Sequence, residues 1–240
     1  MITIISYDST DPESVIEAEE TQRSIERYDG WEVALVPKIT RDFLLERTYK
    51  KWIARGKMES HEDKIKKYPD EEAHFYRSLI KYQIDARSQL LFWQRVAAAK
   101  QPMAFVEAGM KCYGDWQNQN FKGCLMLQFQ HAFDYPTPHE KYYLHTPKNK
   151  EHGVHKIADN YPLVYNHKNE YEGSHIIAGT DAYVINPKGA NQLLSGVSKY
   201  GLDQASHSIN SKFVEIEYLF PSVFRYDTPD LLPMDGTRLP

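Results

Sequence analysis

The pattern that most restricts the fold is an apolar run, a helix start and a second apolar run near the beginning of the chain. Ile2–Ser6 is a short apolar segment typical of a buried strand. Asp11 and Pro12 then begin a helix, because Asp caps free N–H groups and Pro suits the first helical position. Trp31–Val36 forms the second strand. Such a βαβ unit predicts a parallel sheet covered by helices.

Segments further along the chain extend this sheet and supply its helices. Residues 71–100 repeat apolar side chains at helical spacing, and residues 187–197 start with Pro and continue as a helix. Further strands are expected at Met103–Val106, Cys124–Phe129, Ser174–Ile185 and Phe213–Phe220. The sequence predicts an α/β fold with a mainly parallel central sheet flanked by helices. We expect one domain over residues 1–240, with a charged insertion at 55–72 and an irregular tail at 227–240.

Composition and charge argue against several classes of function. The net charge of −4 provides no general field to attract nucleic acid. The two cysteines are not in a Cys-x-x-Cys pair, so neither a disulfide framework nor a zinc knuckle is expected. The ten histidines show no metal-binding spacing on a helix. The chain has no apolar run long enough for a membrane span and no signal-peptide pattern, so we expect a cytoplasmic location.

Two segments place polar residues where an α/β sheet binds ligands. Glu107 directly follows the strand Met103–Val106, and open α/β sheets bind ligands at the carboxyl ends of their strands. Residues 179–194 (GTDAYVINPKGANQLL) predict a strand, a turn and a helix whose free N–H groups favour a diphosphate. Each pattern alone is common in α/β proteins. The sequence fingerprints of serine hydrolases, P-loop NTPases and Gly-x-Gly-x-x-Gly dinucleotide enzymes are missing, which argues against those classes.

Three segments share their order and spacing with one enzyme family. Residues 88–110 (SQLLFWQRVAAAKQPMAFVEAGM) run down a helix into a strand that ends in an acid, as in a Ser-His-Leu, Trp, Glu-Asp-Asp block. Residues 179–194 are similar to a Gly-Thr-x-Ala-Tyr-Leu-Ile-x-x-x-Gly-Ala-x-x-Leu-Leu block, and Asp203 is similar to an acid shortly after it. In these segments the chain resembles the lipooligosaccharide galactosyltransferase-like (family-25) glycosyltransferases.

This resemblance implies a GT-A-like fold, with a nucleotide-binding α/β sheet and an acceptor side built from loops. It implies transfer of a sugar from a nucleoside diphosphate, with a UDP-sugar as the expected donor, to a hydroxyl group of a glycan, a protein or a modified base. Asp203 is the expected base or acceptor-orienting residue, and Asp181 is the second candidate. The residues implied to bind the donor are Ser6, Tyr7, Ser88, Gln89, Glu107, Gly179 and Thr180.

The chain departs from the family at its acidic block. The family brings two or three carboxylates to the strand exit, where Mn²⁺ or Mg²⁺ bridges the diphosphate. The matching positions here are Glu107, Ala108 and Gly109. A hard divalent ion needs several oxygen ligands, so Glu107 would be the one family-type metal ligand left. Gln89 also stands where the family has His, which removes the titratable imidazole.

Several interpretations stay open at this point. The departures permit metal-independent transfer, a metal site rebuilt with Asp115, Asp181 or Asp203, or binding without catalysis. In metal-independent transfer, Lys111, Lys188 or a helix N-terminus would contact the phosphates. The alternative to an enzyme is a catalytically silent nucleotide-sugar-binding or interaction module. A third interpretation is an unrelated α/β hydrolase or nuclease that uses Asp and His with a metal.

Overall fold

The structure is a computed structural model, which describes residues 1–28, 31–40, 43, 70–128, 151–159, 175, 180–202 and 205–226. The expected insertion at 55–72 lies outside the described residues, apart from the backbone of 70–72. The expected tail at 227–240 also lies outside them.

The N-terminal βαβ unit is confirmed. Strand β1 (Ile2–Tyr7) pairs in parallel with β2 (Glu32–Pro37), and α1 (Pro12–Ile25) connects them. The Asp11 side chain accepts a hydrogen bond from the backbone N–H of Glu13 at 3.0 Å, as expected for a helix cap. This local chemistry fixes where α1 begins.

The described strands form a seven-stranded sheet in the order β2-β1-β3-β7-β5-β8-β6. Its strands after β2 are β3 (Met103–Glu107), β5 (Cys124–Met126), β6 (Gly153–Lys156), β7 (Ala182–Ile185) and β8 (Ile216–Phe220). The pairings show that β1, β2, β3, β5 and β8 run in one direction, whereas β7 and β6 run in the other. The α/β class is therefore confirmed, and the sheet is mixed because β7 is inserted antiparallel between β3 and β5.

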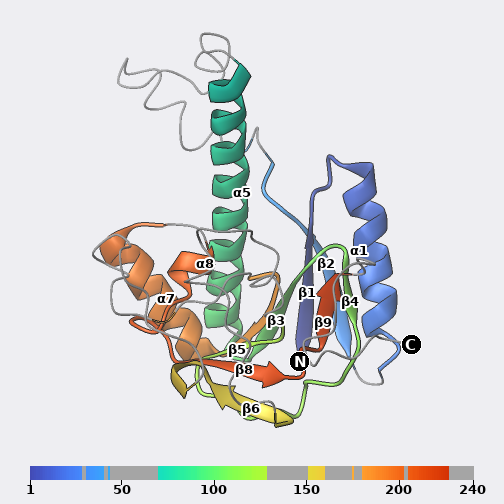
Figure 1. The fold of residues 1–240 in the computed structure, drawn as a ribbon, viewed down its shortest axis with the longest axis vertical. Coiled ribbons are helices and arrows are strands. Elements are labelled where there is room, and N and C mark those ends of the chain that lie inside the picture. The colour runs from blue at the N-terminus through green and yellow to red at the C-terminus, as the bar shows by residue number, and fades with distance from the viewer. Residues whose placement is uncertain are drawn as a thin grey trace.

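Helices cover both faces of the sheet (Figure 1). On one face lie α5 (Asp70–Ala99), α7 (Pro187–Tyr200) and α8 (Ala205–Ser208). On the other lie α1 and a two-stranded sheet of β4 (Met110–Cys112) and β9 (Phe224–Tyr226), and a short 3-10 helix, η3 (Ile157–Asp159), follows β6. Alternate residues of β1 enter the two cores: Ile4 packs on the α5 side and Ile5 on the α1 side.

The C-terminal half of α5 packs tightly on the sheet. Trp93 and Val96 are fully buried, and the Phe92 ring lies 5.3 Å from that of Phe105 and 5.8 Å from that of Tyr183. The helical spacing predicts that the side chains of Trp93, Phe92 and Val96 pack on the sheet rather than line the ligand site, and the structure confirms their packing on the sheet. Phe92 also borders a cavity described below.

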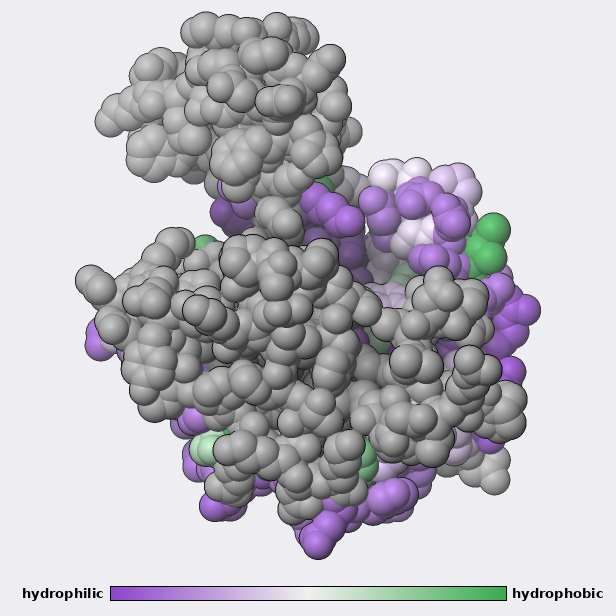
Figure 2. Space-filling model, viewed as in Figure 1, coloured by the Kyte–Doolittle hydropathy of each residue, from purple (hydrophilic) through white to green (hydrophobic). Residues whose placement is uncertain are grey.

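The described surface seen in Figure 2 is mostly hydrophilic, with small separate hydrophobic areas. The large exposed apolar side chains are spread over several elements and include Ile16, Leu35, Leu91, Tyr113 and Tyr200. Among the described residues, no helix combines the length and the apolar character needed to cross a bilayer.

The strand directions define two edges of the sheet. We call the edge where β1, β2 and β3 end the carboxyl edge, and the edge where they begin the amino edge. Because β7 is antiparallel to β3, with Ala182 opposite Val106 and Ile185 opposite Met103, β7 starts at the carboxyl edge and ends at the amino edge.

Candidate functional site

The carboxyl edge brings together residues that are far apart in the sequence. The backbone N–H of Glu107 donates to the carbonyl oxygen of Asp181 at 2.7 Å, and the N–H of Ala108 donates to that of Ser6 at 2.9 Å. Ser6 pairs in register with Glu107. The end of β3 and the residue directly before β7, which come from two separate sequence blocks, therefore meet at one place.

An ion-pair cluster, which we call the Lys38 triad, lies across this edge. The Lys38 Nζ is 2.8 Å from Asp85 Oδ1 on α5 and 2.8 Å from Glu107 Oε2 at the end of β3. The backbone N–H of Lys38 donates to the carbonyl oxygen of Tyr7 at 2.8 Å, which fixes the residue directly after β2. Since β1 lies between β2 and β3, the Lys38 side chain must cross the end of β1 to reach Glu107.

Two carboxylates share one ammonium group in this triad. The side chain of Glu107 is 13% exposed and that of Asp85 is 30% exposed, so Glu107 loses more hydration. Burial raises the pKa of Glu107 to about 7, although the Lys38 charge acts in the opposite direction. Burial alone would lower the pKa of Lys38, but the charges of Glu107 and Asp85 more than offset this and raise it above its ordinary value.

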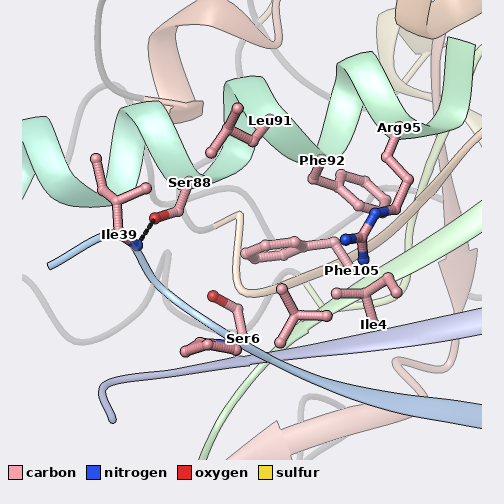
Figure 3. Close-up of a pocket in the computed structure, with 10 residues that line it drawn as sticks. Ile4, Ser6, Ile39, Ser88, Leu91, Phe92, Arg95 and Phe105 are labelled. Carbon is pink, nitrogen blue, oxygen red and sulfur yellow. Dashed lines mark hydrogen bonds between the residues drawn. The ribbon is translucent and has the colours of Figure 1, made fainter. Parts of the chain in front are cut away.

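Ser88 and Gln89 have different places, although both were predicted to contact a nucleotide. The Ser88 Oγ accepts a hydrogen bond from the backbone N–H of Ile39 at 3.1 Å and thereby ties α5 to the segment after β2 (Figure 3). Gln89 is only 3% exposed. Its Oε1 accepts from the Tyr183 hydroxyl at 2.8 Å, and its Nε2 donates to Thr180 Oγ1 at 3.3 Å.

Gln89 belongs to a buried chain of hydrogen bonds. The Trp93 Nε1 donates to the Tyr183 hydroxyl at 2.8 Å, which completes the chain from α5 to β7. Buried polar groups need such partners, because an unpaired one loses its hydration without compensation. The structure thus places Gln89, together with the side chain of Thr180, in the scaffold behind the carboxyl edge and away from solvent.

Of the two predicted catalytic acids, only Asp181 is described. It lies directly before β7, beside Glu107. Burial raises the pKa of the Tyr226 hydroxyl on β9, and the charges of Asp181 and Glu107 and a side-chain hydrogen bond with Asp181 raise it further. Asp203 and Gly179 lie outside the described residues.

A cavity of about 100 Å³ adjoins the triad, between α5 and strands β1, β2 and β3 (Figure 3). Its apolar walls include Ile4, Phe92 and Phe105, and Ser6 and Ser88 supply hydroxyl groups. Arg95 extends from α5 toward Phe105 in Figure 3. The volume is on the scale of cavities that hold one small ring.

The acid block does not fit a divalent metal ion. Among the described residues, no three Asp, Glu, His or Cys side chains lie close enough to hold one. The Glu107 carboxylate, the expected ligand, is already paired with an ammonium group. Gly109 has a φ of +89°, which side chains disfavour, and a Cβ there would lie 3.4 Å from the Glu17 carboxylate. Restoring an acid at position 109 would meet both strain and like charge.

The predicted phosphate site at the N-terminus of α7 lies at the amino edge, away from Glu107. The Asn186 side chain already accepts from the N–H of Gly189 at 2.8 Å and donates to the carbonyl oxygen of Lys122 at 2.8 Å. A Cβ on Gly189 would lie 2.7 Å from the carbonyl oxygen of Gly123, so the helix start is packed against protein. Lys188 lies at this same amino edge.

Sequence reasoning missed Lys38, Asp85 and Arg95. Lys38 follows a parallel strand just as Glu107 does, and that position was the signal that could have identified it. Lys111, a predicted phosphate ligand, forms an ion pair with Glu20 on α1. No protein-family model matches the chain, and no curated protein shows significant similarity to it.

Proposed function

We propose that the chain is a sugar-nucleotide-dependent glycosyltransferase with a GT-A-like sheet, and that the carboxyl edge binds the donor. The observation that carries this proposal is the 2.7 Å hydrogen bond between the Glu107 N–H and the Asp181 carbonyl oxygen. It joins Glu107, near the end of one of the three segments that carry the resemblance, to Asp181, near the start of another. Ligands of open α/β sheets bind at this kind of edge.

The adjoining cavity supports a nucleotide as the ligand. Phe92 and Phe105 provide apolar ring faces, while Ser6, Ser88 and Arg95 can hydrogen-bond the polar edge of a base. The Lys38 triad lies at the neighbouring strand ends. The phosphates of a nucleotide whose base lies in the cavity would reach these strand ends. A UDP-sugar is the donor that the resemblance implies.

The reaction exchanges one bond at the anomeric carbon of the sugar. Its bond to the diphosphate oxygen breaks, a bond to the acceptor oxygen forms, the acceptor proton passes to a base, and the nucleoside diphosphate leaves. Glu107, with a pKa raised to about 7, and Asp181 are the described acids placed to take that proton. Asp203 stays a prediction for this role.

One observation favours the alternative of a catalytically silent binding module. Both Asp85 and Glu107 are engaged by Lys38, so neither is free in this state to act on a substrate. A silent module would bind the nucleotide at the same edge and release no product.

Calorimetric titration with UDP, followed by measurement of UDP release from a set of UDP-sugars, tests the proposal. Wild type is expected to bind UDP and to release it slowly from one sugar donor. Asp181→Asn should lower the release rate by about 10²- to 10⁴-fold, the size of effect that follows loss of an acid–base group. Glu215→Gln, an exposed acid at the amino edge, is the matched control and should leave the rate unchanged.

The outcomes separate the two candidates. Binding with release of UDP supports the enzyme, and binding without release from any donor supports the silent module. No binding of UDP by folded protein would contradict both.

A further inference from the structure

Lys38 holds a fixed positive charge at the carboxyl edge. Its backbone is anchored to Tyr7, and its side chain crosses β1 to lie between the carboxylates of Asp85 and Glu107. A divalent metal ion in the resembled enzymes would lie at this strand exit and would likewise be held by carboxylates. The described residues offer no such metal site.

The ammonium group keeps a donor for a ligand. Lysine has three N–H donors, and two of them are used by the 2.8 Å contacts to Asp85 and Glu107. The third has no partner among the described residues. Because 19% of the Lys38 side chain is exposed, this donor can reach a ligand from solvent.

We infer that Lys38 is a built-in cation that binds the diphosphate group of the donor in place of a divalent metal ion. The inference rests on the proposed function, since it names the group that holds the donor at that same site. A lysine ammonium binds phosphate as a point charge, and its four-carbon stem allows it to follow the leaving diphosphate.

Charge at the edge makes Asp85 the competitor of the diphosphate. When both carboxyl groups are ionised, two negative charges share one ammonium group, and their excess repels an incoming anion. The anion must therefore displace one carboxylate from Lys38. The side chain of Asp85 is the more exposed of the two, at 30% against 13% for Glu107. Once released from Lys38, the Asp85 carboxylate can be hydrated by solvent, so its release costs less free energy than release of Glu107. We expect the diphosphate to replace Asp85 while Glu107 keeps its contact.

The test is calorimetric titration of UDP and of inorganic pyrophosphate into the full chain, first in EDTA and then with Mn²⁺. Lys38→Met is expected to weaken both ligands at least about tenfold in EDTA. Asp85→Asn is expected to tighten them, an effect that a merely structural role would not produce. Lys122→Met, which removes the lysine paired with Glu215 at the amino edge, is the matched control and should bind as wild type does.

A second variant guards against loss of folding. Lys38→Met leaves two carboxylates without their cation, so Lys38→Met combined with Glu107→Gln keeps the buried part of the site neutral. We expect this double variant to fold, as judged by thermal unfolding, and to bind UDP and pyrophosphate as weakly as Lys38→Met does. Lys38→Arg, which keeps the charge, should retain more affinity than either variant.

Each result bears on a different claim. Equal affinity of wild type and Lys38→Met, or wild-type binding of UDP only when Mn²⁺ is present, would overturn the role of Lys38 and leave nucleotide binding standing. Lys38-dependent binding of pyrophosphate without any binding of UDP would support Lys38 and overturn the proposed donor. Binding of neither ligand would overturn both.

Discussion

The two edges of the central sheet are built from similar elements, but their polar groups are engaged in different ways. At the amino edge, α7 starts after a strand, but Asn186 caps its N–H groups and the carbonyl oxygen of Gly123 lies against Gly189. At the carboxyl edge, three strands end at an ion-pair cluster beside a cavity. A helix start favours anions only while its donors are free. We propose that the two edges differ in ligand binding because the donors at the start of α7 are already satisfied within the protein.

The largest expected effect concerns the scaffold behind the carboxyl edge. Trp93→Ala should lower the free energy of unfolding by about 3–5 kcal/mol, because it empties a fully buried site and removes the donor to the Tyr183 hydroxyl. Thermal and urea unfolding measure this, with the exposed neighbour Gln94→Ala as control. If Trp93→Ala leaves the melting temperature unchanged but abolishes UDP binding, the residue belongs to the site and the assignment is wrong.

The second prediction uses the pH dependence of the carboxyl edge. Burial raises the folded-state pKa of Glu107 to about 7, above its ordinary value of 4.5, so the favourable contribution of this group to stability is full below pH 4.5 and is lost as pH rises through 7. Lys38, Asp85, Asp181 and Tyr226 face this carboxyl group. Between pH 5 and pH 8, wild type should lose about 1–3 kcal/mol of stability relative to Glu107→Gln.

Unfolding of both proteins at several pH values checks this difference. Groups that titrate elsewhere affect wild type and Glu107→Gln alike, so the difference isolates Glu107. Parallel stability curves for the two proteins would show that Glu107 is ionised throughout this range.

The smallest expected effect concerns the amino edge. Asn186→Ala should cost about 1 kcal/mol of stability through loss of the helix cap, and it should leave the affinity for UDP unchanged. Gln192→Ala, at an exposed position of the same helix, should change stability by less than about 0.5 kcal/mol. A large loss of UDP affinity in Asn186→Ala would move the ligand site to the amino edge and reverse the comparison.

Elements defined by local chemistry could be predicted from the sequence. The Asp11 cap placed the start of α1, and apolar runs placed β1, β2, β3 and β5. The direction of β7 could not be predicted, because an apolar run reads the same in a parallel or an antiparallel strand. That direction moved the start of α7 to the amino edge and left Asp181 beside Glu107.

The composition of the site depended even more on non-local contacts. Glu107 was identified from its position after a strand, but its partners Lys38 and Asp85 belong to other elements. Gln89 was expected at the ligand because of a sequence block, whereas its burial becomes visible only when α5 is placed against β7. Spacing along the chain carries no information on such pairs.

The most direct test of the carboxyl edge as a metal-independent donor site is a crystal structure of the protein with UDP bound in the presence of EDTA. We expect electron density for the diphosphate against Lys38 Nζ, with the base in the cavity beside Phe105, Asp85 turned to solvent and the N-terminus of α7 unliganded. Density for the nucleotide at the α7 N-terminus, or a complex that forms only with a metal ion bound to Glu107, would contradict it.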